Sequence, residues 1–195
     1  MLQTTRNLFG IESNFVEDNP SSVRNYEAGS LINYDNEIKL YTNDRAGKAG
    51  RAKWFIANKD IITSNIDLIG EWQVVVSSAN AGGQMRNNQL EIIDNHSAIG
   101  RTRVSLASFK TQKEAKNFYK YVQSFLIRFM FLMTEENLSS LGKKVPDIGD
   151  YSDANQLIDF TLDVNQQLYK LIGLNDEEVL YVVSLIKDLN RNPKK

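Results

Sequence analysis

A polar run that follows three valines carries side chains suited to reading a nucleic acid. The run from Val74 to Asn88 holds two glycines, four amides and one arginine, and it contains no carboxylate. Asn, Gln and Arg carry hydrogen-bonding groups that match the major-groove edges of adenine and guanine, and adjacent glycines let a backbone approach a ligand closely. An ordinary solvated loop is the alternative interpretation. The residues that we expect at base edges are Asn80, Gln84, Arg86, Asn87 and Asn88.

A second candidate segment runs from Lys39 to Lys59, where six basic residues accompany a single acid, Asp44, if Asp60 is left outside. Basic side chains bind DNA phosphates mainly through charge, and they do so locally, so the net charge of −1 for the whole chain does not exclude such binding. A solvated charge run, or a loop that docks an acidic protein, are the alternatives. The residues that we expect at phosphates are Arg45, Lys48, Arg51 and Lys53.

Two further features bear on the orientation of such an interface. Arg101 and Arg103 alternate along a predicted strand, so we expect them on one face, at phosphates or at base edges. From Asp147 to Glu178 the chain carries eight acids against Lys170 alone. We expect this acidic part to face away from DNA, toward a catalytic domain or solvent.

Strands are predicted in the first half of the chain. Residues 36–42 alternate in polarity, residues 53–57 are aromatic and β-branched, and residues 71–77 are typical of a buried strand. With residues 89–93 and 102–106 they predict one mixed or antiparallel sheet of about five strands. The candidate DNA-contacting loops connect these strands.

Helices are predicted in the second half. Thr111 and Glu114 form a capping box, and apolar residues recur at helical spacing to about Met133, which predicts one long helix packed on the sheet. A connector follows, then a helix over 164–172 closed by Gly173 and a last helix begun by Asn175. The fold class is therefore α+β, with 1–142 as sheet plus long helix and 143–195 as connector and C-terminal helices of the same domain.

Composition sets the wider limits. A chain of 195 residues with 42% hydrophobic residues can bury one full core. It has no cysteine, which excludes disulfides and thiolate metal sites, and it has no 18-residue apolar run or basic-then-apolar leader pattern. We expect a cytoplasmic protein that does not engage a membrane.

Several segments resemble a known family over roughly residues 30–188, namely YDNEIKLYT, IITSNIDLIGEWQVVVSSANAGG, FKTQKEAKNFYKYVQSFLIRFM, VPDIGDYS and LYKLIGLNDEEVLYVVSLI. They are similar to the carboxy-terminal target-recognition, or specificity, domain of type II restriction-modification enzymes with a fused adenine-specific DNA methyltransferase. The closest pieces are a helix pattern and a C-terminal pattern, carried by Glu114, Ala115, Asn117, Arg128, Phe129, Leu168, Tyr169, Lys170, Gly173, Leu174, Glu177 and Glu178.

The resemblance implies sequence-specific binding of double-stranded DNA beside methyltransferase and possibly endonuclease domains. S-adenosylmethionine and Mg²⁺ are then expected only in those partner domains. This chain lacks the Asn/Asp-Pro-Pro-aromatic motif that holds a flipped adenine, because none of its prolines (Pro20, Pro146, Pro193) sits in such a context. We therefore expect no catalytic residue, no metal ligand and no cofactor in the chain itself.

A metal-dependent nuclease is the main enzymatic alternative. Such a site needs an Asp followed by Glu/Asp-x-Lys, so that two carboxylates hold the metal and the lysine assists the attacking water. Asp94 with 114–116 meets the spacing, as does Asp18 or Asp35 with 37–39. Glu114 is also the predicted partner in a capping box, so the same carboxylate has a competing structural role. A non-catalytic protein-interaction module is the other alternative.

Overall fold

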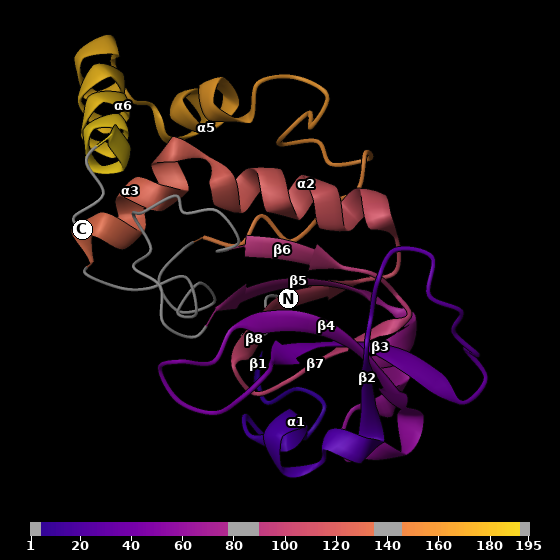
Figure 1. The fold of residues 1–195 in the computed structure, drawn as a ribbon. Helices are drawn as coiled ribbons and strands as arrows, with labels where there is room; N and C mark the ends of the chain where they lie inside the picture. Colours follow the sequence, from indigo (N-terminus) through magenta and orange to yellow (C-terminus); the bar gives the residue numbers. More distant parts are fainter. Residues whose placement is uncertain (1–4, 78–89, 135–145, 192–195) are drawn as a thin grey trace.

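The computed structural model describes residues 5–77, 90–134 and 146–191 (Figure 1). Its strands are β1 (Thr5–Arg6), β2 (Val23–Asn25), β3 (Glu37–Asn43), β4 (Ala52–Asn58), β5 (Trp72–Ser77), β6 (Leu90–Ile93), β7 (Ser97–Ile99) and β8 (Arg103–Phe109). Its α-helices are α1 (Phe15–Asp18), α2 (Gln112–Gln123), α3 (Phe125–Met133), α5 (Val164–Ile172) and α6 (Asp176–Arg191). Short 3-10 helices cover Pro20–Ser22, Lys59–Ile61 and Ile66–Gly70.

The strands form two four-stranded sheets. The inner sheet has the order β1-β8-β5-β6 and is antiparallel; the outer sheet has the order β2-β4-β3-β7, with β3 and β7 parallel and the other pairs antiparallel. The α+β class is confirmed, and all five predicted strands form. The prediction of a single sheet is wrong: β5, β6 and β8 belong to the inner sheet, whereas β3 and β4 belong to the outer sheet. The chain crosses from β6 to the outer sheet, where β7 pairs with β3, and returns to the inner sheet with β8. Strands of two or three residues, such as β1, β2 and β7, are too short to show an alternating pattern.

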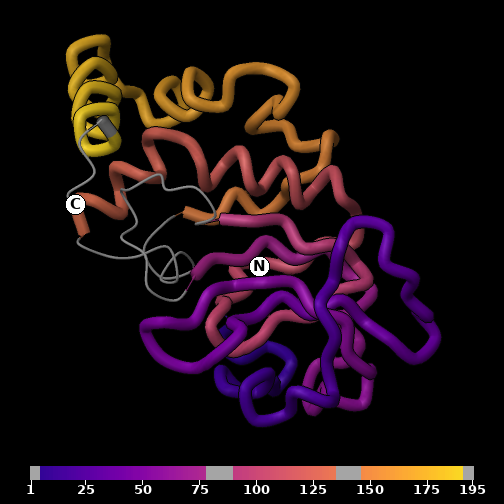
Figure 2. The backbone as a smooth tube through the Cα atoms, viewed as in Figure 1, coloured from indigo at the N-terminus to yellow at the C-terminus, as the bar shows by residue number. Residues whose placement is uncertain are grey.

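The inner sheet is buried on both faces. Val74 and Val76 pack in a cluster with α2 and α3, whereas Val75 between them packs with Ile38 and Leu40 of the outer sheet. Side chains on a strand alternate between faces, so a run of three valines serves both clusters. The molecule is therefore layered as helices, inner sheet and outer sheet, an arrangement that the backbone trace in Figure 2 shows clearly.

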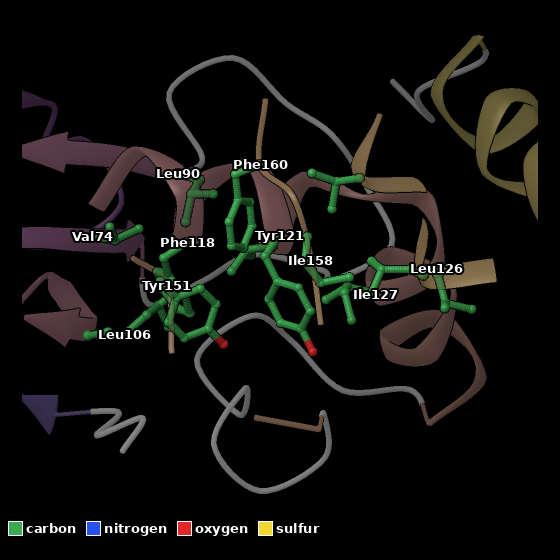
Figure 3. Close-up of a cluster of buried hydrophobic side chains, with 14 of the residues drawn as sticks. Val74, Leu90, Leu106, Phe118, Tyr121, Leu126, Ile127, Tyr151, Ile158 and Phe160 are labelled. Carbon is green, nitrogen blue, oxygen red and sulfur yellow. The ribbon is translucent and has the colours of Figure 1, made fainter. Parts of the chain in front are cut away.

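The helical layer shares one core with the inner sheet. Figure 3 shows Phe118 and Tyr121 of α2 gathered with Tyr151, Ile158 and Phe160, which come from the segment that precedes α5. Rings of Phe118 and Tyr151 meet edge to face with centroids 4.9 Å apart. Residues 146–163 thus contribute large side chains to the core, although they contain no helix or strand.

The predicted long helix is two helices. The capping box is confirmed, since the Thr111 side chain accepts from the Glu114 amide and the Glu114 carboxylate accepts from the Thr111 amide. The helix ends at Ser124, whose backbone is extended (φ −61°, ψ 148°). The Phe125 amide donates to Asn165 Oδ1 at 2.8 Å, so α5 supplies the acceptor that an uninterrupted helix would have provided.

The C-terminal helices form as predicted. Asp163 caps α5, and Gly173 ends it in the left-handed region with φ +80°. Asn175 and Glu178 form the reciprocal cap of α6 at 3.0 and 2.9 Å. None of the helices within the described ranges is both long and apolar enough to cross a membrane.

Gly100 offers a test of the packing between β3 and the β7–β8 turn. A Cβ at this buried position would lie 2.7 Å from Thr42 Cβ, so the neighbouring backbone would have to shift. We expect Gly100→Ala to lower the free energy of unfolding by about 1–3 kcal/mol, the usual effect of overpacking. Urea denaturation measures the free energy of unfolding.

The control is Gly70→Ala, where a Cβ would meet open space. We expect this variant to change the free energy of unfolding by no more than about 1 kcal/mol. Equal stability of the two variants would contradict the close packing of Gly100 against Thr42.

Candidate nucleic-acid interface

The β3–β4 loop presents cations on a braced backbone. Arg45, Lys48 and Arg51 are all exposed. The Arg45 Nε donates to Ala49 O at 3.3 Å, and the Arg51 guanidinium donates to the carbonyls of Lys48 and Gly50 at 3.2 and 3.1 Å. These hydrogen bonds are all made to carbonyls of the loop, which do not neutralise the positive charges. Asp44 is the one acid in the loop sequence.

Asp44 neutralises one of the four predicted phosphate-binding residues. Lys53 Nζ lies 2.7 Å from Asp44 Oδ2, and the Arg51 amide donates to Asp44 Oδ1 at 2.9 Å. The hydrogen bond from Lys53 and then that from Arg51 lower the pKa of Asp44 to about 2. The loop is also braced from α1, because the Ala46 amide donates to Glu17 Oε2 at 2.9 Å. All four predicted cations are exposed, and Lys53 differs from Arg45, Lys48 and Arg51 in that an ion pair with Asp44 offsets its charge.

Tyr41 anchors the strand that leads into this loop. Its hydroxyl donates to Glu91 Oε1 at 2.6 Å, which joins β3 of the outer sheet to β6 of the inner sheet. Its ring stacks on Trp54 at 4.8 Å and carries the Arg103 guanidinium 4.8 Å from its centroid. Burial, and then the hydrogen bond to Glu91, raise the pKa of Tyr41 to about 12.

The two predicted loops leave the sheets at the same end. Thr102 Oγ1 donates to Asn43 Oδ1 at 3.3 Å, and Asn43 is the last residue of β3 before the basic loop. The adjacent Arg103 pairs in the inner sheet with Ser77, the last described residue before the amide-rich segment. The structure thus brings the starting points of both loops together. The predicted base-contacting residues Asn80, Gln84, Arg86, Asn87 and Asn88 themselves lie outside the described residues.

Arg101 and Arg103 do not share a strand face, which corrects that expectation. Arg101 lies in the turn before β8, is exposed, and pairs with Glu12 at 2.7 Å. Arg103 opens β8 and is only 8% exposed because it packs over Tyr41. A turn between the two residues breaks the alternation that the sequence suggested.

The nuclease pattern is not assembled by the described residues. Glu114 is used in the capping box, and Lys116 donates to Gln112 on the same helix. Asp94 pairs with Lys39 and accepts from Ser97 Oγ at 2.6 Å. Within the described ranges, no three His, Asp or Glu side chains are grouped as metal ligands usually are.

Looser pairings in that pattern also have other partners. Glu37 forms a bidentate pair with Arg24 at 2.9 Å and accepts from the Asn33 amide at 2.9 Å. The hydrogen bond from the Asn33 backbone amide, and then that from the Arg24 side chain, lower the pKa of the Glu37 carboxyl. Lys39, two residues on, is the partner of Asp94 and lies 5.6 Å from the Trp54 ring centroid. The carboxylate and the lysine of 37–39 thus form separate ion pairs.

Sequence reasoning missed the polar contacts between the sheets. Tyr41, Glu91 and Arg103 are separated by up to 62 positions in the sequence, and no short motif links them. Local pattern gave no signal for them, because Tyr41 lies among the mixed residues of β3 and Arg103 is the first residue of β8. Buried polar groups need partners, and these partners come from distant parts of the chain.

Comparisons with known proteins identify no relative. No family model, no curated protein and no solved structure matches the chain.

The Tyr41–Glu91 contact predicts a pH dependence. The folded-state pKa of Tyr41, about 12, lies above its ordinary value of 10.0, so the resulting stabilisation is complete below about pH 10 and is lost as pH rises through 12. We expect Glu91→Gln to lower the pKa of Tyr41 without restoring the ordinary value, because burial remains. NMR titration of ¹³C-labelled tyrosine measures it, with Glu27→Gln as an exposed control. An unchanged Tyr41 pKa in Glu91→Gln would show that Glu91 does not stabilise the neutral phenol.

Proposed function

We propose that this chain binds double-stranded DNA in a sequence-specific way through the end of the molecule that carries the β3–β4 loop. The observation that carries the proposal is the position of this loop. Its exposed cations Arg45, Lys48 and Arg51 lie beside the strand end from which the amide-rich segment starts. Phosphate contacts fix register, and amide and guanidinium groups read base edges, so both kinds of residue are needed on one side.

Charge distribution supports this orientation. The loop keeps three exposed cations after Lys53 has paired with Asp44. The first turn of α6 carries Asp176, Glu177 and Glu178, and α6 belongs to the helical layer on the opposite face of the inner sheet from the outer sheet. A polyanion is attracted to the loop and repelled from α6.

The setting that we propose is a restriction-modification enzyme. The chain would act as the target-recognition domain beside an adenine-specific methyltransferase and possibly an endonuclease. S-adenosylmethionine and Mg²⁺ would be bound by those domains, and this chain would contribute affinity and sequence choice. The segments quoted for the family resemblance support this part of the proposal.

The basic loop predicts a salt-dependent affinity. Three phosphate contacts imply a slope of about −2.7 in a plot of log affinity against log salt for B-DNA. We expect Lys48→Ala to weaken binding to all duplexes alike and to flatten this slope by about one unit. Lys48 is the best choice, because the Arg45 and Arg51 side chains also bond loop carbonyls. Fluorescence anisotropy over a salt series measures both quantities.

Lys170→Ala is the matched control, since Lys170 is exposed on α5 and is the single base among the eight acids of residues 147–178. It should leave the affinity and the slope unchanged. Equal effects of the two substitutions, or no binding by the folded chain at low salt, would contradict the assignment of the loop. Equally tight binding of polyglutamate would favour a loop that docks an acidic protein.

The amide-rich segment predicts sequence choice. We expect Gln84→Ala or Arg86→Ala to cost about 1–3 kcal/mol on the preferred site while leaving non-specific binding nearly unchanged. Selection from a randomised duplex pool, followed by competition binding, measures this. If both variants select the same sequence as the wild type with the same preference, base reading does not reside in these side chains.

A further inference from the structure

A second surface, unrelated to the basic loop, lies between α3 and α6. A hollow of about 400 Å³ is lined by Leu126, Phe129, Leu174, Glu177, Glu178, Tyr181 and Val182. Leu126 and Val182 are buried at its floor. The rings of Phe129 and Tyr181 meet edge to face with centroids 6.0 Å apart, so α3 and α6 are in contact there. The groove is therefore apolar and formed by packed side chains.

Large apolar side chains are exposed in the same part of the chain. Tyr181, which lines the hollow, is 57% exposed, its neighbour Leu180 on α6 is 69% exposed, and Leu171 and Ile172 at the end of α5 are about half exposed. Single exposed apolar residues are ordinary, but an exposed aromatic ring that lines an apolar hollow is typical of an interaction site.

The rim of the groove indicates the chemistry of its occupant. Glu177 and Glu178 line it, and Asp176 precedes them in the first turn of α6. From Val164 to Ile186 the only base in the sequence is Lys170. A second copy docked at this groove about a two-fold axis would bring the same carboxylates together, and an anionic membrane would be repelled by them. A cationic partner gains from the same charges.

We infer that this groove binds an amphipathic helix of a partner protein whose apolar face is flanked by lysine or arginine. Apolar anchors one helical turn apart would fill the hollow beside Phe129 and Leu174, as in other helix-in-groove complexes. The basic flank would lie along Glu177 and Glu178. The inference concerns the helical layer and does not depend on DNA binding by the β3–β4 loop.

The test uses synthetic peptides and the full chain. A peptide of about 15 residues, with leucine and lysine at helical spacing, is titrated against the wild type by calorimetry. One control peptide has glutamate in place of lysine, and another has serine in place of leucine. We expect the leucine–lysine peptide to bind at least about tenfold more tightly than either control, because the groove requires both the apolar face and the positive charge.

Variants of the chain locate the binding. Tyr181→Arg should lower the affinity for the leucine–lysine peptide about tenfold or more, because it places a positive charge at the apolar rim. Glu177→Lys should lower this affinity about fivefold at low salt, because it replaces a negative charge by a positive one. Leu31→Arg, at a side chain 90% exposed elsewhere, and Asp67→Lys, at an exposed acid, should have no effect. If Tyr181→Arg does not fold, Glu177→Lys still tests the inference, because Glu177 is exposed and its replacement should leave the fold intact.

Three results would overturn the inference. The first is equal binding of the peptide by the wild type, Tyr181→Arg and Glu177→Lys. The second is equal binding of the glutamate peptide. The third is a wild-type dimer, seen by light scattering, that Tyr181→Arg dissociates, because the occupant would then be a second copy.

Discussion

Tyr41 joins the two sheets at the end of the molecule from which the basic loop leaves. Its hydroxyl reaches Glu91 of the inner sheet, its ring stacks on Trp54 of the outer sheet, and the buried Arg103 guanidinium lies over it. A buried arginine needs such a partner, since burial without one is costly. The contact fixes β3 against β8 and β6, and it thereby fixes where the β3–β4 loop and the segment after Ser77 begin.

Much of the fold followed from local patterns. The capping box at Thr111 and Glu114, the Gly173 stop and the Asn175–Glu178 cap all depend on residues within four positions of each other, and each formed. The division into two sheets did not follow, because the pairing of β7 with β3 depends on contacts between distant segments. The break at Ser124 was equally hidden, since its stabilising acceptor, Asn165, lies forty residues away.

The candidate interface was predictable in composition and less so in detail. Arg45, Lys48 and Arg51 are exposed as their charge suggested. Lys53 is held by Asp44, a pairing that requires the hairpin register between Asn43 and Ala52. Arg103 is buried, which only the packing of the two sheets against each other reveals. Sequence thus indicates which charges are present, and tertiary contacts decide which remain available.

In the proposed complex, DNA meets the end of the molecule that carries the β3–β4 loop. The most direct measurement is chemical-shift mapping of the ¹⁵N-labelled full chain on addition of a randomised duplex at low ionic strength. We expect the backbone amides from Asp44 to Arg51 to shift together, while those of α5 and α6 do not. Shifts confined to α5 and α6, or no shifts at all in a folded chain, would contradict it.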